Sequence, residues 1–235
     1  MHNRSKSVRE IVLDTETTGL NPLKGDRLVE IGCVELDNGI PTGHNWHFYF
    51  NPERDMPAEA EAVHGLSAAF LADKPLFADL ADQFLEFVDD ARLVIHNADF
   101  DMGFLNMELG RCGRPLLDTA NVVDTLAMAR RRHPGGGNRL DDLCQRYGID
   151  NSRRTKHGAL LDSELLAEVY IELNGGRQAG LALVSRDRGE VRGAMKAPDS
   201  RPAPLPARIS EAERAAHDAF VVKLGENAIW RRYGN

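Results

Sequence analysis

The sequence predicts an α/β protein in which a mixed central sheet is flanked by helices. Strand-like segments come first, and helical segments then alternate with a short apolar strand, which is the order typical of α/β layering. The chain has 235 residues, of which 42% are hydrophobic and 28% are charged. This length and composition suffice for one full core and an appendage.

The strands are expected at apolar runs that are bounded by turns. The first follows Val8, and two more occupy residues 27–36 and 46–50 around an Asp-Asn-Gly turn at residues 37–39. Together these three segments predict an antiparallel meander. A fourth strand, short and buried, is expected at residues 92–95.

Helical spacing takes over in the second half of this region. A helix begins near residues 97–99 and ends at the glycines of 110–113, two more flank the Pro-Gly-Gly-Gly loop at 134–137, and another covers about 158–173. The clearest amphipathic helix spans residues 77–88, where the apolar residues are Phe77, Leu80, Ala81, Phe84, Leu85 and Val88.

The chain divides into three parts by composition. Residues 1–176 form the main domain, and residues 177–208, rich in Arg, Gly, Pro and Ser, are expected to be a flexible linker. Residues 209–235 form a helical tail, which opens with a capping box of Ser210 and Glu213. A short amphipathic helix cannot bury its apolar face alone. Docking on a partner is favoured, and folding back on the main domain is the alternative.

Composition limits the class of protein. The net charge of −7 argues against a protein that grips duplex DNA by neutralising phosphates, although it leaves open nucleic acid bound at a metal site. No stretch of about 18 apolar residues predicts a membrane span. Three scattered cysteines, Cys33, Cys112 and Cys144, indicate buried thiols of a reducing compartment, so the cytoplasm is expected.

Two carboxylates, Asp14 and Glu16, stand one residue apart at the mouth of the first strand. Alternate residues of a strand share a face, so both side chains point the same way. Neighbouring anions are disfavoured unless a cation lies between them, and hard oxygen ligands suit Mg²⁺ or Mn²⁺. A strand that merely ends in a polar turn is the alternative interpretation.

Two further clusters carry groups of the same kind. Asp101 lies in the first turns of the helix that starts near residue 97, where a carboxylate also complements the helix dipole. His157 and Asp162 are five residues apart, which is off one helical face, so His157 is expected in the loop and Asp162 in the helix body. A mobile histidine beside metal-bound carboxylates can deprotonate a water molecule.

Together these residues resemble the DEDD exonucleases of the histidine type, whose motifs are Asp-x-Glu, Asp and His-x4-Asp. The flanking words are Asp-Thr-Glu-Thr-Thr-Gly from residue 14, His-Asn-Ala-Asp-Phe-Asp from residue 96 and His-Gly-Ala-Leu-Leu-Asp from residue 157. They are similar to those of the family members that proofread for bacterial DNA polymerase III. The resemblance covers about residues 8–176 and, more weakly, the tail.

The resemblance implies a ribonuclease H-like fold and two divalent cations, Mg²⁺ or Mn²⁺, about 3.5 to 4 Å apart on the terminal phosphodiester. It implies Asp14 as a ligand of both cations, Glu16 and Asp162 on the side of the attacking water, and Asp101 on the other. His157 is then the general base. The implied activity is removal of mismatched nucleotides from the 3′ end of a DNA primer.

The resemblance also implies substrate contacts. Glu59 and His64 match family positions near the terminal nucleotide, with Glu59 at the sugar 3′ hydroxyl, although Glu59 could equally be an acid on a helix surface. The substrate is a single-stranded or frayed DNA 3′ end, which needs less unpairing than a matched duplex. The full set of expected substrate contacts is Asp14, Glu16, Glu59, His64 and Asp162.

Two protein partners are implied as well. The segment Gln178-Ala-Gly-Leu181-Ala-Leu183 is similar to a degenerate form of the glutamine-led peptide that docks on a sliding clamp. The tail, with Trp230 near its end, is similar to the segment that attaches such exonucleases to the catalytic (alpha) subunit of the polymerase.

Two alternatives stay open from the sequence. The first is a free-standing exonuclease of the histidine type that acts on RNA ends or on DNA repair intermediates, since only the linker and tail favour replication. The second is a non-catalytic adaptor that bridges clamp and polymerase. The retained acids and histidine argue against the adaptor, because such a cluster costs stability without metals.

Overall fold

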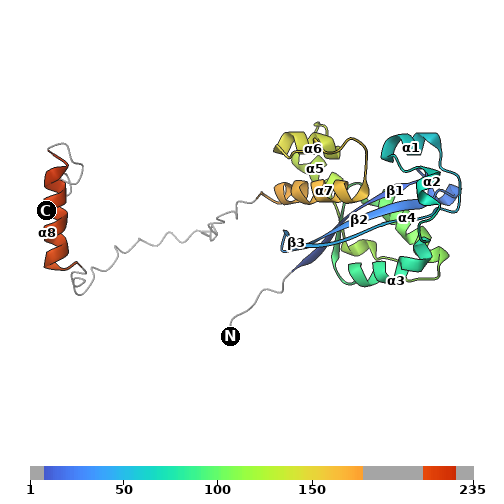
Figure 1. Ribbon diagram of the computed structural model, residues 1–235, viewed down its shortest axis with the longest axis horizontal. Coiled ribbons are helices and arrows are strands. Elements are labelled where there is room, and N and C mark those ends of the chain that lie inside the picture. The colour runs from blue at the N-terminus through green and yellow to red at the C-terminus, as the bar shows by residue number, and fades with distance from the viewer. Residues whose placement is uncertain (1–7, 177–208, 226–235) are drawn as a thin grey trace, which may run out of the picture. The chain divides into compact units, whose positions relative to one another are not determined.

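One mixed sheet organises the protein, and the computed structural model describes it within residues 8–176, with residues 209–225 as a separate segment. Its strands are β1 (Arg9–Thr17), β2 (Leu28–Asp37), β3 (Ile40–Tyr49), β4 (Arg92–Ile95) and β5 (Val122–Asp124). The strand order is β3-β2-β1-β4-β5 (Figure 1). β2 is antiparallel to both β1 and β3, whereas β4 and β5 run parallel to β1. The predicted meander and mixed sheet are confirmed.

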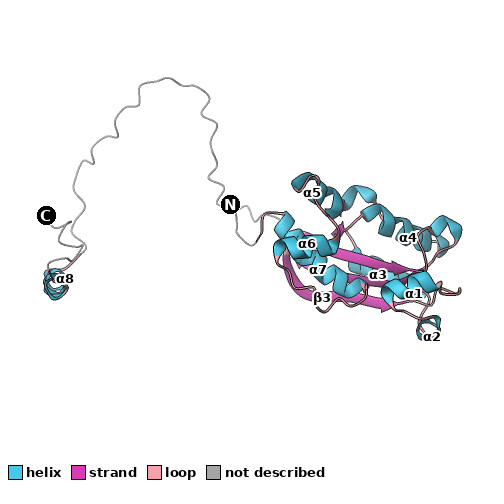
Figure 2. Ribbon diagram, turned by 90° about the horizontal axis from the view of Figure 1, so that it is seen from above, coloured by secondary structure: helices cyan, strands magenta, loops and turns pink. Residues whose placement is uncertain are grey.

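Helices cover both faces of this sheet, as Figures 1 and 2 show. On one face lie α3 (Phe77–Val88) and α4 (Ala98–Arg111), and on the other lie α5 (Thr125–Arg132), α6 (Leu140–Tyr147) and α7 (Ala159–Leu173). Two short helices, α1 (Ala58–His64) and α2 (Ala68–Leu71), follow β3. Short 3-10 turns, η1 (Pro22–Lys24) and η2 (Thr119–Asn121), complete the connections.

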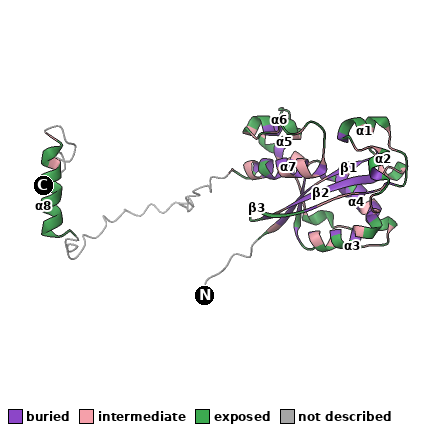
Figure 3. Cartoon of the chain, in the orientation of Figure 1, coloured by how far each residue is buried: buried purple, intermediate pink, exposed green. Residues whose placement is uncertain are grey.

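Successive side chains of β1 point to opposite faces of the sheet, and so to the two helical layers. Ile11 and Leu13 pack in the core against α3 and α4, while Val12 between them packs against α7. Figure 3 shows β1 and β2 as largely buried, in contrast to the exposed first residues of β3. Residues 14 and 16 therefore belong to the α7 face, and residue 15 belongs to the α4 face.

Close approach between α7 and the sheet fixes the helix in place. A Cβ at Gly32 would lie 2.2 Å from the backbone nitrogen of Leu160, so this strand position has room only for hydrogen. Ser163 donates a hydrogen bond to the Gly32 carbonyl at 2.8 Å, and Tyr170 donates to buried Glu10 at 2.7 Å. These contacts seat the helix that carries Asp162.

Some elements differ from the expectation. β3 begins at Ile40 and not at residue 46. Its first residues are exposed and are held by backbone pairing with β2, so their side chains give no alternating apolar pattern from which the strand could be predicted. The helices α1 and α2 and the strand β5 were not expected, since elements of seven, four and three residues carry little periodic signal. The first strand continues through the acidic pair to Thr17, so the polar-turn interpretation is wrong.

The segment 209–225 contains one helix, α8 (Glu211–Lys223). The predicted capping box is present: the Glu213 amide donates to Ser210 Oγ at 3.3 Å, and the Glu213 carboxylate accepts from the Ser210 amide at 2.8 Å. Within the described residues, no helix has the length and apolar character that a membrane crossing requires.

Candidate active site

The acids of the first motif stand on β1 at its carboxyl end. Asp14 pairs with Gly32 of β2, and Glu16 pairs with Glu30. Glu16 is 8% exposed and Glu30 is 3% exposed, so two acids face each other in a buried place. Like charges directly opposite each other destabilise a sheet, and Glu30 has a compensating contact to His47 at 2.7 Å. Glu16 has no ion pair among the described residues.

The acid of the second motif comes from the opposite layer. Asp101 lies in α4, is 3% exposed, and accepts a hydrogen bond from Thr15 Oγ at 2.7 Å. Thr15 sits between the two acids of β1 but points to the α4 face, which explains how one strand contacts carboxylates of both layers. The helix begins after Asn97, whose left-handed φ of 70° turns the chain from β4 into α4.

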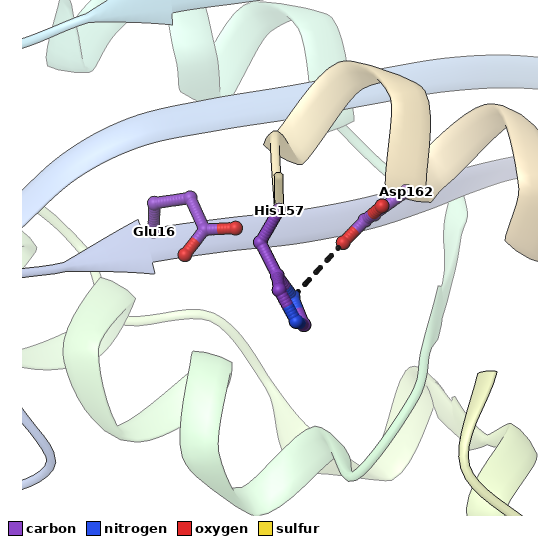
Figure 4. Close-up of side chains that lie close together, drawn as sticks. All are labelled: Glu16, His157 and Asp162. Carbon is purple, nitrogen blue, oxygen red and sulfur yellow. Dashed lines mark ion pairs between the residues drawn. The ribbon is translucent and has the colours of Figure 1, made fainter. Parts of the chain in front are cut away.

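The third motif approaches from α7. Asp162 is 2% exposed in the first turn of this helix, and His157 lies in the preceding loop with half of its side chain exposed. His157 Nδ1 is 3.4 Å from Asp162 Oδ2, as the dashed line in Figure 4 marks. One ligand atom each from Glu16, His157 and Asp162 lies within 4.8 Å of the other two. The structure thus brings the first and third motifs together (Figure 4).

Sequence reasoning missed Arg154. Its guanidinium donates to both oxygens of Asp162, at 2.5 and 2.7 Å, and to Asp141 at 2.8 Å. It also lies 2.8 Å from His157 Nδ1. An arginine in a polar loop is usually solvated, so its residue type gave no sign of a role. The only available signal was that Arg154 precedes His157 of the third motif by three residues.

The four acids, Asp14, Glu16, Asp101 and Asp162, are hereafter called the acid cluster. Burial raises the pKa of Asp14 well above its usual range, and the other three carboxylates raise it further. Burial and acidic neighbours raise the pKa of Glu16 to about 8. Burial also raises the pKa of Asp101 to about 7, although the hydrogen bond from Thr15 opposes this effect.

Asp162 behaves differently from the other three acids. Burial again acts to raise its pKa, but hydrogen bonds from Arg154 and His157 outweigh burial and lower the pKa. The same pairing raises the pKa of Arg154, so this guanidinium stays charged. Asp162 is therefore paired with a cationic side chain of the protein, Arg154, whereas the other three acids have only acidic neighbours within the cluster.

The donor set fits hard divalent cations. Carboxylate oxygens dominate it, and one oxygen each of Glu16 and Asp162 lie within 4.8 Å of each other, a separation similar to that of two opposite ligands of one Mg²⁺ at about 2.1 Å each. Asp14, Glu16 and Asp101, the acids without a protein cation, are the groups that such ions would neutralise. A cleft of about 720 Å³ opens beside them and is lined by residues that include Asp14, Arg130, Arg139, Arg154, His157 and Asp162.

Two of the expected substrate residues, Glu59 and His64, lie on α1, apart from the acids of β1 and α7. His64 is 5% exposed, its Nδ1 accepts a hydrogen bond from the Leu66 amide at 3.0 Å, and its Nε2 has no protein partner among the described residues. Burial lowers the His64 pKa. Glu59 is exposed in the first turn of α1, and no hydrogen bond or ion pair within residues 8–176 ties it to the acid cluster. The expected partner residues Gln178, Leu181, Leu183 and Trp230 lie outside the described residues.

Comparison with known proteins agrees with this arrangement. A family model described as "Exonuclease" matches residues 11–170. DNA polymerase III subunit epsilon of Rickettsia conorii is 57% identical over 183 residues, which make up 77% of this chain and 80% of that protein. DNA polymerase III subunit epsilon of Salmonella typhimurium is 44% identical over 238 residues, covering 95% of this chain and 97% of that protein.

A solved structure extends the comparison to three dimensions. Exonuclease X, in complex with 5′ overhanging duplex DNA, matches 70% of this chain and 90% of its own with a TM-score of 0.55 and 25% identity. The fold predicted from the resemblance, a ribonuclease H-like exonuclease fold, is confirmed. The chain belongs to the exonuclease family and, within it, to the epsilon subunits of DNA polymerase III.

Proposed function

We propose that this chain removes mismatched nucleotides from the 3′ end of a DNA primer, as the proofreading 3′–5′ exonuclease of a replicative DNA polymerase III. The observation that carries the proposal is the convergence of Glu16, His157 and Asp162 within 4.8 Å, with Asp14 and Asp101 beside them. A free-standing RNA or repair exonuclease would share this site, but relatives that match nearly the whole chain are polymerase subunits. The site also argues against a non-catalytic adaptor.

The acid cluster would hold two divalent cations, Mg²⁺ or Mn²⁺. Glu16 and Asp162 would bind the cation on the side of the attacking water, Asp101 the other, and Asp14 both. When bound, such cations make water acidic enough to be deprotonated near neutral pH and stabilise negative charge on the leaving oxygen. The acids themselves contribute a fixed set of oxygen donors, held by β1, α4 and α7.

His157 would act as the general base. It lies in a loop and is half exposed, so its ring can turn toward a water molecule in the cleft. Its backbone amide donates to the Val63 carbonyl at 3.2 Å, which fixes the base of the side chain to the end of α1. The ring would accept a proton from the attacking water and release it to solvent after cleavage.

The substrate would enter the cleft as an unpaired end. Unpairing costs less at a mismatch than at a matched terminus, so a site that surrounds the last nucleotide prefers frayed ends without reading bases. His64, with an unpartnered Nε2 in a buried position, would contact the terminal nucleotide, and Glu59 would accept a hydrogen bond from the sugar 3′ hydroxyl.

The remainder of the chain would join this nuclease to the replication machinery in the cytoplasm. Helix α8 carries exposed apolar side chains at Phe220 and Val222, and its C-cap Leu224 is exposed as well. These side chains suit docking on the alpha subunit of the polymerase together with Trp230. The segment that contains Gln178, Leu181 and Leu183 would bind the sliding clamp. Residues 1–176 would be the exonuclease domain, 177–208 the linker and 209–235 the polymerase-binding segment.

Degradation of a 5′-labelled single-stranded DNA tests the proposed reaction. The protein with Mg²⁺ or Mn²⁺ should produce a ladder that shortens from the 3′ end, faster on a mismatched primer than on a matched one. An RNA of the same sequence and the protein treated with a chelator are the controls. Trimming of RNA alone would move the protein to the exoribonucleases, and cleavage of neither substrate would favour the adaptor.

Truncation after Gly176 tests the assignment of the three parts. The shortened protein should keep full activity on single-stranded DNA and lose binding to the alpha subunit. An inactive or unfolded product would show that the tail belongs to the catalytic domain.

A further inference from the structure

Arg154 is a buried cation that touches the acid cluster. Its side chain is 8% exposed, and its fork holds both oxygens of Asp162 while a third nitrogen donates to Asp141 of α6. The nitrogen that reaches Asp162 Oδ2 also lies 2.8 Å from His157 Nδ1. This one side chain therefore links the catalytic loop, α6 and α7.

The pairing differs from an ordinary surface ion pair. Exposed pairs contribute little, whereas a buried, bidentate arginine–carboxylate pair fixes the geometry of both partners. Asp162 is the one member of the acid cluster with an ion pair among the described residues. Arg154 is thus hydrogen-bonded to the acid that, under the proposed function, binds a divalent cation.

We propose that Arg154 is a positioning residue and built-in counter-cation of the metal site. It holds Asp162, and through Asp162 the ring of His157, in the working position before a divalent cation binds, and its positive charge then opposes that cation. This inference rests on the proposed function, since it takes Glu16 and Asp162 as metal ligands. It goes beyond that function because the metal affinity of the site is set partly by a side chain that is not a ligand.

Removing the charge of Arg154 should change affinity and turnover in opposite directions. Without a positive charge beside Asp162, the acid cluster attracts a divalent cation more strongly, and we expect binding about tenfold tighter. Without the fork, Asp162 and His157 lose their common anchor, and we expect kcat to fall about a hundredfold. A residue that only supported the fold would lower both quantities when replaced.

The experiment compares Arg154→Gln with the wild-type protein in the full chain. Free Mn²⁺ is measured by electron paramagnetic resonance during a titration without substrate, and kcat is measured at saturating Mn²⁺ on single-stranded DNA. The melting temperature of the chelator-treated protein is a third readout, and it should fall in the variant because Asp162 loses its partner.

Two further variants separate charge from geometry and control for the surface. Arg154→Lys keeps the charge but lacks the fork, so its Mn²⁺ affinity should stay near that of the wild type while kcat falls. Arg153→Gln removes the neighbouring arginine, which is 73% exposed and 3.7 Å from Glu164 at the surface. Neither affinity nor kcat should change in this control.

The outcomes distinguish this inference from the proposed function. Tighter Mn²⁺ binding with slower turnover in Arg154→Gln supports it, and an affinity equal to or weaker than that of the wild type overturns it. If the lysine variant binds Mn²⁺ as tightly as the glutamine variant, charge is not the cause and the inference fails. Wild-type protein that neither binds Mn²⁺ nor cleaves DNA would overturn the proposed function itself.

Discussion

The two sides of the site differ in how their charges are balanced. The sheet side, as defined here, comprises Asp14 and Glu16 of β1 and Asp101 of α4; the charges of these acids repel one another, and none has an ion pair in the part of the chain that the structure describes. On the helix side, Asp162 is paired with Arg154 and His157. Burial, reinforced by acidic neighbours, raises the pKa values on the first side, whereas hydrogen bonds from Arg154 and His157 outweigh burial and lower the pKa of Asp162 on the second.

Buried anions without partners cost stability, whereas a buried pair with good hydrogen bonds maintains its geometry. Under the proposed function, the helix side would therefore be assembled before a cation binds, and the sheet side would gain its charge balance from bound cations.

Replacement of Asp14 should have the largest effect and tests the sheet side. Asp14→Asn removes an expected ligand of both cations, so kcat should fall by about ten-thousandfold. The same change removes a carboxyl group whose charge is repelled by its acidic neighbours, so the metal-free protein should melt at a higher temperature than the wild type. Single-turnover cleavage and thermal denaturation with a chelator measure the two effects.

Asp99→Asn is the matched control, because Asp99 is exposed in the first turn of the same helix that carries Asp101. Its activity should equal that of the wild type. Retained cleavage in Asp14→Asn would contradict the assignment of the metal ligands.

Replacement of His157 tests the helix side at its exposed end. His157→Ala should lower kcat about a hundredfold, since a general base contributes roughly that much, and should leave Mn²⁺ affinity within about twofold. The acidic limb of the pH–rate profile should disappear with the imidazole. His44→Ala, which changes a histidine exposed on β3, controls for surface effects. A variant profile identical to that of the wild type would exclude His157 as the base.

The sequence predicted the shared face of Asp14 and Glu16 well because the information for it is local. The spacing of Asp14 and Glu16 on a strand already implies a shared face, and the structure agrees. The helix side depends on contacts between distant segments. The Arg154 pair with Asp141 and the seat of α7 on Gly32 arise from packing, which no periodic pattern announces.

The same physical reason separates the predicted elements from the missed ones. The helix at residues 77–88 was predicted to the residue, because its apolar side chains all face the core and so repeat with the helical period. The first half of β3 has no buried side chain before Trp46, so only its backbone pairing identifies it as strand. The contact between Asp101 and Thr15 could not be predicted from the sequence, because it depends on how α4 packs against the sheet.

Displacement of α7 should disturb the helix side without changing any charge. Gly32→Ala would place a Cβ within 2.4 Å of the Ala159 and Leu160 backbone, so the helix must move and unfolding free energy should fall by about 2 kcal/mol. Asp162 would move with α7, and kcat should fall more than Mn²⁺ affinity. Gly110→Ala, at an exposed helix position with space for a methyl group, should be neutral or stabilising.

The last expected effect, which concerns the metal-free protein alone, is the dependence of its stability on pH. The pKa values of Glu16 and Asp101 are raised to about 8 and about 7, so both groups bind protons more tightly in the folded than in the unfolded state. Their stabilising contribution is complete below their unfolded pKa values and is lost as pH rises through about 7 to 8. Between pH 6 and pH 9 the metal-free protein should lose about 4 kcal/mol of unfolding free energy from these two groups.

Urea denaturation with a chelator at both pH values measures this loss, and saturating Mg²⁺ should reduce it because cations replace the protons. The double variant Glu16→Gln and Asp101→Asn separates these two groups from the rest of the protein, since its stability should fall less over the same pH range. On the helix side, Asp162 has a lowered pKa, so its contribution is already complete at pH 6 and does not change up to pH 9. An equal loss in the double variant would show that the charge imbalance of the sheet side is not what limits the metal-free protein.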